Sequence, residues 1–141
     1  MTLEAFNGDW VLTAEENSAK FLEAAGMSWI MRKAAGAAGY GVGKGRHIIT
    51  VEGDNFTVTL KTPIKTDTTT VSLSSTEYQP CKDLQDEPTT CLITVTDGVI
   101  ENRLAEKNGK VLSVKRYLQD GKMLLDLSIA GVNSRRTFTK Q

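Results

Sequence analysis

Arg116 and Arg136 are the two side chains in this sequence whose placement most clearly implies a chemical task. Each lies in a segment of alternating character, and successive side chains of a β-strand point to opposite faces. Arg116 therefore shares a face with Leu118, and Arg136 shares a face with Phe138. A guanidinium group stays charged at any physiological pH, so away from bulk water it needs a charged partner or solvation. The pattern predicts an interior that holds water, an acidic partner, or both.

The other side chains suited to chemistry are few: one histidine, His47, and two cysteines, Cys81 and Cys91. A hairpin could bring the two thiols together, but reduced thiols are favoured because the chain shows no secretory segment and the cytosol is reducing. Two sulfurs and one imidazole do not supply four ligands at a structural-zinc spacing. We therefore expect neither a metal site nor a cofactor.

An enzyme would need a general base or a nucleophile beside the group that activates it. His47 stands next to Arg46 at the start of a strand, far from Arg136 in the sequence, and the chain contains no G-x-S-x-G motif. The sequence therefore predicts no catalytic residue.

The overall composition favours a neutral or small partner. The chain has 141 residues, with 17 acidic and 17 basic side chains spread along it and a formal net charge of zero. Such a distribution carries no electrostatic footprint for nucleic acid. No apolar run approaches the ~18 residues of a membrane span, and the first residues do not have the pattern of a signal peptide. We expect one soluble, cytoplasmic domain over residues 1–141.

From residue 47 onward the sequence alternates in character and turns at regular intervals. A hairpin is predicted at Gly53 to Asn55, and further turns at Asp97-Gly98, Asn108-Gly109, Asp120-Gly121 and Gly131 to Asn133. Short antiparallel strands at this spacing are typical of a sandwich or a barrel.

Residues 14–38 have helical character. A first helix is predicted to open at Glu15 to Asn17 and to end at Gly26, and a second spans Ser28 to Ala38. Both follow a first strand at Gly8 to Thr13. The two helices form a helix-turn-helix cap, or they simply pack on the sheet and complete its core.

A glycine-rich segment, residues 36–45, follows the second predicted helix. Its spacing fits neither G-x-G-x-x-G opening a helix nor the P-loop pattern. We interpret it as a connector or an entrance loop.

Motifs spread along nearly the whole chain resemble those of the intracellular lipid-binding proteins, which include the fatty-acid-binding and the cellular retinoic-acid-binding proteins. They run in the family's order: Phe6-Asn7-Gly8-Asp9-Trp10 for F-x-G-x-W, Asn17 with Phe21-Leu22 and Gly26, Met31-Arg32-Lys33-Ala34, Glu52-Gly53-Asp54 with Phe56, Arg116-Tyr117-Leu118 with Asp120-Gly121-Lys122, and Arg136-Thr137-Phe138. Secreted lipocalins share the opening G-x-W, but a helix pair directly after the first strand separates the two groups.

The resemblance implies an all-β fold: a ten-stranded antiparallel up-and-down β-barrel, calycin-like, with a helix-turn-helix lid between the first two strands. It implies an intracellular, monomeric carrier that binds a long-chain fatty acid or a similar amphipathic carboxylate inside the barrel. In the family two arginines and a tyrosine take the carboxylate. The matching positions here are Arg116, Arg136 and Phe138, and Phe138 has no hydroxyl. By analogy with the intestinal branch, which also ends in R-x-F, Arg116 is expected to contact the carboxylate directly, and Arg136 to act through water or to support the network.

The portal and the cavity wall are expected to involve Phe21, Trp29, Met31, Phe56 and Val58. Plain packing is the alternative for the apolar stripe of the helices. Basic residues of the lid are expected to allow transient contact with anionic membrane surfaces.

Two other functions stay open from the sequence. One is a retinoic-acid-type carrier, since the second helix resembles that branch. The other is a lipid-modifying enzyme on the same barrel, for which no catalytic set is visible.

Overall fold

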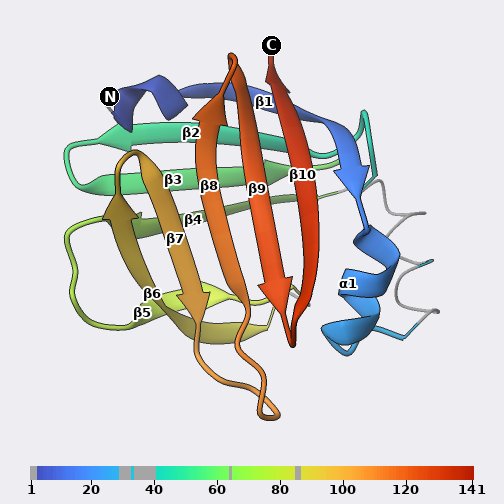
Figure 1. The fold of residues 1–141 in the computed structure, drawn as a ribbon. Helices are drawn as coiled ribbons and strands as arrows, with labels where there is room; N and C mark the ends of the chain where they lie inside the picture. The colour runs from blue at the N-terminus through green and yellow to red at the C-terminus, as the bar shows by residue number, and fades with distance from the viewer. Residues whose placement is uncertain (1–2, 29–32, 34–40, 64, 85–86) are drawn as a thin grey trace.

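The computed structural model describes residues 3–28, 33, 41–63, 65–84 and 87–141. Ten strands form a single sheet that curls into a barrel (Figure 1). The strands are β1 (Gly8–Glu16), β2 (Arg46–Glu52), β3 (Asn55–Lys61), β4 (Thr66–Ser72), β5 (Gln79–Lys82), β6 (Pro88–Thr96), β7 (Val99–Leu104), β8 (Ser113–Gln119), β9 (Lys122–Ile129) and β10 (Val132–Lys140). A short 3₁₀ helix, η1 (Leu3–Phe6), precedes β1, and the helix α1 (Ser18–Ala24) follows it.

The strand order is β4-β3-β2-β1-β10-β9-β8-β7-β6-β5, and every ladder is antiparallel. Chain neighbours pair with each other, and the ladder between β1 and β10 joins the first strand to the last. This joint converts a meander into a barrel, so that alternate side chains face one enclosed interior. The prediction of a ten-stranded antiparallel barrel is confirmed.

The barrel remains open between its two edge strands, β4 and β5, where the described residues form no ladder. Side chains bridge the edges instead. The Ser72 backbone N–H donates to Gln79 Oε1 (2.8 Å), and Gln79 Nε2 donates to the Ser72 carbonyl (2.9 Å). Lys82 Nζ lies 3.0 Å from a carboxylate oxygen of Asp67. The amide of Gln79 thus takes the place of a strand backbone at the gap.

Tight two-residue turns join several of the strands. Asp97 and Gly98 have φ of 51° and 79°, and Asp120 and Gly121 have 53° and 77°. Positive φ at both central residues defines the type I′ turn, whose twist matches that of the flanking strands. The turns predicted at these dipeptides are confirmed, and the ladders run directly up to them.

The helical region differs from the prediction at its start. Glu15 and Glu16 belong to β1, and α1 begins only at Ser18 after Asn17, which has a left-handed φ of 58°. The reason is long-range: a bulge after Leu12 lets β1 continue along β10, and this pairing outweighs the local helical signal. The predicted second helix lies outside the described residues except for Ser28 and Lys33, and so do residues 36–40 of the glycine-rich segment.

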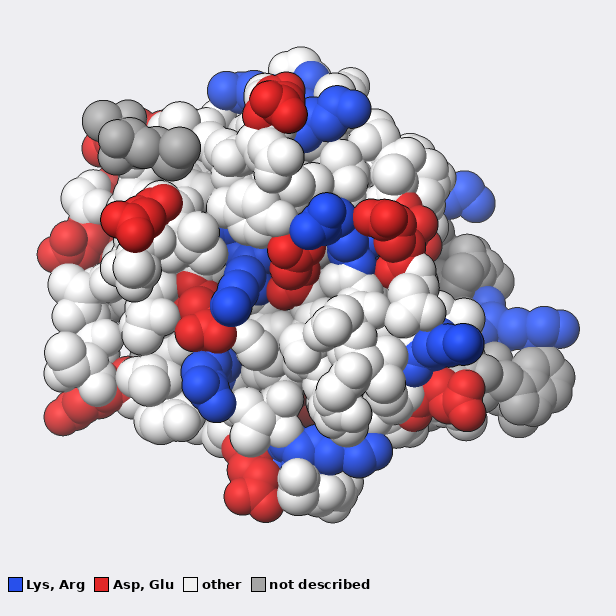
Figure 2. Space-filling model, viewed as in Figure 1, with Lys and Arg blue, Asp and Glu red and all other residues white. Residues whose placement is uncertain are grey.

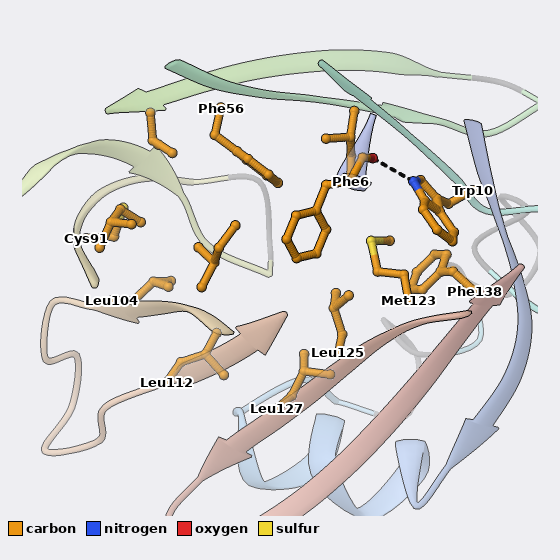
Figure 3. Close-up of a cluster of buried hydrophobic side chains, with 14 of the residues drawn as sticks. Phe6, Trp10, Phe56, Cys91, Leu104, Leu112, Met123, Leu125, Leu127 and Phe138 are labelled. Carbon is orange, nitrogen blue, oxygen red and sulfur yellow. Dashed lines mark hydrogen bonds between the residues drawn. The ribbon is translucent and has the colours of Figure 1, made fainter. Parts of the chain in front are cut away.

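Buried hydrophobic side chains form a cluster in the barrel interior (Figure 3). Phe6 and Trp10 pack there with Met123 and Phe138, and each of the four is at most 2% exposed. The indole N–H of Trp10 donates to the Phe6 carbonyl at 2.8 Å, which satisfies the polar edge of a buried ring. The 3₁₀ helix η1 is therefore anchored into the barrel by its own phenylalanine.

The outside of the barrel carries acidic and basic side chains interspersed with one another on the face shown in Figure 2. Within the described ranges, no helix has the length and apolar character needed to cross a membrane.

Candidate functional site

The barrel encloses a cavity of about 590 Å³. This volume falls within the range of roughly 300 to 1,000 Å³ found for small-molecule sites. The wall is largely apolar, with side chains from most strands: Phe56, Val58, Ile93, Ile100, Leu104, Leu112, Val114, Leu125 and Leu127. The same wall also carries polar side chains, with Arg116, Arg136, His47 and Glu15 in one group and Asp67 and Lys82 at the gap between β4 and β5. A long apolar molecule with one polar end would match such a lining.

The two predicted arginines project from one rung of the sheet. Arg116 on β8 and Arg136 on β10 both pair with Leu125 on the strand between them. Their backbones are therefore two strand spacings apart, roughly 10 Å. Both guanidinium groups line the same cavity, as the alternation of the sequence predicted.

Arg116 has only uncharged partners among the described residues. Its Nη1 lies 3.2 Å from His47 Nδ1 and 3.3 Å from Met123 Sδ, and its guanidinium lies over the Phe56 ring at 5.7 Å. Arg116 is half-buried, because part of it faces the cavity. Burial within the barrel lowers the pKa of Arg116 to about 10, so the group keeps its positive charge at neutral pH.

Arg136 is satisfied even less by the protein. Its Nε is buried without a hydrogen-bond partner among the described residues. Burial lowers the pKa of Arg136, while Glu15, opposite it in the ladder with β1, acts in the other direction. The two other orphaned polar atoms, Ser18 Oγ and Asn102 Oδ1, also belong to residues of the cavity wall.

His47 lies beside the two arginines and packs on Phe138. The imidazole of His47 lies against the phenyl ring of Phe138, with ring centroids 4.4 Å apart and planes inclined at 38°. Burial, and then the positive charges of Arg116 and Arg136, hold the pKa of His47 well below its usual value. At neutral pH the imidazole is therefore uncharged.

The predicted wall residues occupy different positions. Phe56 and Val58 on β3 line the cavity. Phe21 on α1 is fully buried in the hydrophobic core, and its neighbour Leu22 lines the cavity. Phe138 lies behind His47 in the core cluster and is 1% exposed. Trp29 and Met31 lie outside the described residues.

Sequence reasoning did not assign His47 to this site. The sequence indicates only that His47 is far from Arg136 along the chain and has no evident catalytic partner. The signal that could have identified it is alternation: His47 shares a face of β2 with Ile49 and Val51, both buried. That pattern places the imidazole inward by the rule that placed the arginines.

The remaining chemistry-bearing side chains are the two cysteines. Cys81 on β5 and Cys91 on β6 are free thiols. Burial, together with a hydrogen bond to Cys91, raises the pKa of Cys81 to about 12, which keeps this thiol protonated. Among the residues that the structure describes, no group of three or more His, Cys, Asp or Glu side chains is arranged to hold a metal ion.

No protein-family model matches the chain, but individual proteins align with it over nearly its full length. The adipocyte fatty acid-binding protein of Pygoscelis papua is 27% identical over 137 residues, which cover 97% of this chain and 98% of the relative. The apo crystal structure of Caenorhabditis elegans lipid binding protein 8 superposes with a TM-score of 0.84 at 21% identity, over 100% of this chain and 99% of that one. The fatty acid binding protein of Schistosoma mansoni in complex with arachidonic acid superposes with a TM-score of 0.83 at 15% identity, over the same shares.

The chain is thus similar to fatty acid-binding proteins over nearly its full length, and its barrel has the fold of solved lipid-binding proteins. The resemblance predicted from the F-x-G-x-W opening and the terminal R-x-F segment is confirmed. The chain combines two inward arginines with a phenylalanine, Phe138, and a histidine, His47, that pack against one another.

Proposed function

We propose that this lipid-binding protein carries a long-chain fatty acid, with the hydrocarbon tail in the apolar cavity and the carboxylate at Arg116 and Arg136. The single observation that supports this most is the absence of any ion pair for Arg116 in the described part of the chain, where its partners are an imidazole, a thioether and a phenyl ring. A buried guanidinium without a carboxylate is costly, and an anionic ligand would remove that cost.

The two ends of such a ligand would contribute differently. Burial of a methylene group is worth about 0.8 kcal/mol, so a sixteen-carbon tail would contribute on the order of 10 kcal/mol before ordering costs. A charge-assisted hydrogen bond from arginine is worth about 1.5 to 3 kcal/mol net. The tail would therefore supply most of the affinity, and the arginines would select an acid over an alcohol or an ester.

In this proposal the two arginines have unequal roles. Arg116 is the direct contact, since it already lies in a defined position between His47 and Met123. Arg136 acts through water, because the phenylalanine two residues later has no hydroxyl to complete a direct clamp. Phe56 and Val58 contact the hydrocarbon tail of the ligand. The solved structure of the Schistosoma mansoni fatty acid binding protein, which shares the fold and holds arachidonic acid, supports a fatty acid as cargo.

A retinoic-acid-type ligand is the second candidate, since it shares the carboxylate. A fatty acid with its flexible, linear tail is favoured over a retinoid. The reason is that Phe138 stands at the position of the family's tyrosine, so the two arginines lack the hydroxyl that would complete a carboxylate clamp. The proposal describes a monomeric cytoplasmic carrier without enzymatic activity.

Native mass spectrometry of the freshly purified protein, followed by extraction and identification of the bound lipid, tests the proposal. We expect a fatty acid in a one-to-one complex. A delipidated sample titrated with palmitic acid and with 1-hexadecanol provides the matched comparison, and the acid should bind at least about tenfold more tightly. Recovery of neutral lipids alone, or equal affinity for acid and alcohol, would contradict the proposal.

A further inference from the structure

The contact between Arg116 and His47 determines the tautomer of the imidazole. A guanidinium group donates hydrogen bonds and cannot accept them, so the nitrogen that faces it must carry a lone pair. That nitrogen is Nδ1, which lies 3.2 Å from Arg116 Nη1. In the neutral ring the proton is then on Nε2.

The Nε2–H group has no hydrogen-bond partner among the described residues, whereas the ring itself lines the cavity. Packing against Phe138 fixes the plane of the imidazole, with ring centroids 4.4 Å apart. The imidazole is thus held by Arg116 at Nδ1 and by Phe138 on one face. Its Nε2–H group remains available as a hydrogen-bond donor.

Few charged groups surround this donor. Arg116 on β8 and Arg136 on β10 are the cations that act on His47, and Glu15 on β1 acts on Arg136. The other charged residues of the cavity wall are Lys65, Asp67, Lys82 and Asp83, next to the gap between β4 and β5. β3 and β9 contribute apolar side chains to the wall. An oxygen anion near His47 would therefore find two positive groups and one neutral donor.

We propose that His47 is a specificity-determining residue of the fatty-acid site, and that its Nε2–H donates to the ligand carboxylate held by Arg116. This supplies the neutral donor that Phe138 lacks. The five N–H groups of Arg116 allow it to keep its bond to Nδ1 while it contacts the carboxylate. The inference rests on the proposed function, because it assigns a residue to the same head-group site.

The carboxylate would also change the protonation of His47. The two guanidinium groups disfavour an imidazolium ion, and a bound anion offsets them. By linkage, binding of the acid is then coupled to proton uptake at His47 as the pH falls, and a ligand without a negative charge is not coupled in this way.

Nitrogen-15 NMR of the delipidated protein tests the tautomer directly, since His47 is the only histidine in the chain. We expect an unprotonated Nδ1 and a protonated Nε2 at pH 7, and a change in the Nε2–H signal when palmitic acid is added but a smaller one with methyl palmitate. A protonated Nδ1 in the apo protein, or an Nε2–H signal that ignores palmitic acid, would overturn the proposal.

Calorimetric titration of two variants tests the energetic role. His47→Phe keeps a ring against Phe138 but removes both nitrogens, and it should weaken palmitic acid about tenfold or more while methyl palmitate changes by less than about threefold. His47→Gln keeps a donor and an acceptor and should restore most of the affinity. Methyl palmitate binding shows that each variant is folded with an intact cavity.

The possible outcomes distinguish a failure of the role of His47 from a failure of the fatty-acid site. If the wild-type protein binds palmitic acid and His47→Phe binds it equally well, the role of His47 is overturned and the fatty-acid site stands. If the wild-type protein binds methyl palmitate as tightly as palmitic acid, the head-group site itself is overturned, and the role of His47 with it.

Discussion

Arg135 and Arg136 are adjacent on β10, yet they lie in opposite environments. Arg135 points outward and belongs to a satisfied cluster, in which its Nε donates to Asp126 Oδ1 at 2.7 Å and its Nη2 donates to the Tyr117 hydroxyl at 3.2 Å. Arg136 points into the cavity, where its Nε has no hydrogen-bond partner among the described residues. The two faces of the same three strands, β8, β9 and β10, thus differ in whether a carboxylate from these strands is hydrogen-bonded to the arginine, and the acid that acts on Arg136 is Glu15 on β1.

The carboxylate of the outer cluster behaves as a permanent counterion. Partial burial would raise the pKa of Asp126, but hydrogen bonds from Arg135 and Tyr117 leave it below its usual value. On the inner face the position across β9 from both arginines is Leu125. The comparison teaches that a guanidinium with its own carboxylate is structural, whereas the ones that face the cavity are those to which we propose that a ligand's acid binds.

The largest effect is expected from Arg116→Leu. Affinity for palmitic acid should fall about 10- to 100-fold, since a charge-assisted hydrogen bond is lost. The free energy of unfolding of the apo protein should be unchanged or higher, by up to about 4 kcal/mol, because a buried charge is replaced by a side chain that packs. Calorimetry and thermal unfolding measure the two quantities.

The matched control for this variant is Arg135→Leu, which removes the same group from the outer face. Palmitic acid should bind it within about twofold of the wild type, because the exposed charge is screened from the cavity. Equal losses in the two variants would show that general charge rather than the cavity position matters.

The pH dependence of stability reports on the inner face through His47. The pKa of this histidine is lowered in the folded apo protein, so the unfolded chain takes up the proton first. The free energy of unfolding should therefore fall as the pH decreases below about 6.5, by at most about 1.4 kcal/mol per pH unit. Urea unfolding between pH 7.5 and 5.5 measures this slope.

His47→Gln provides the reference for that slope and should remove most of it. Saturating palmitic acid should reduce the slope in the wild type, since the carboxylate stabilises the charged imidazole. Identical slopes in the wild type and the variant would assign the pH dependence to other groups.

A smaller loss is expected from Arg136→Leu. If Arg136 reaches the carboxylate through water, affinity for palmitic acid should fall by about two- to fivefold, less than for Arg116→Leu. A loss as large as that of Arg116→Leu would indicate two direct contacts and would remove the asymmetry between the arginines.

The smallest effect on binding is expected from Asp126→Asn, which breaks the outer cluster. Stability should fall by about half a kcal/mol, typical of a surface ion pair, while palmitic acid binds as before. The pKa of Tyr117, which partial burial and the bond to Asp126 raise, should move back toward its ordinary value in an ultraviolet titration. A change in palmitic acid affinity would mean that the two faces are coupled.

Much of the barrel could be read from local patterns in the sequence. The turns at Asp97-Gly98 and Asp120-Gly121 follow from residues that accept positive φ, and they define the strands between them. The inward orientation of Arg116 and Arg136 follows from alternation alone. The predicted start of α1 was wrong because the pairing of β1 with β10 extends the first strand through Glu16. The residues around Glu16 do not indicate this long-range pairing.

The sequence by itself determined which side chains enter the interior, because a strand has a fixed period of two. Only the tertiary structure decided which of them meet. Closure of the barrel sets β2 beside β1 and β1 beside β10, and this brings His47 onto Phe138 and to Arg116, 69 residues away in the chain. Arg135 meets its aspartate within the hairpin of β9 and β10, whereas Arg136, the next residue, faces the cavity. The contacts of His47 depend on the register between strands that are distant in the sequence. The alternation of side chains within one strand does not determine that register.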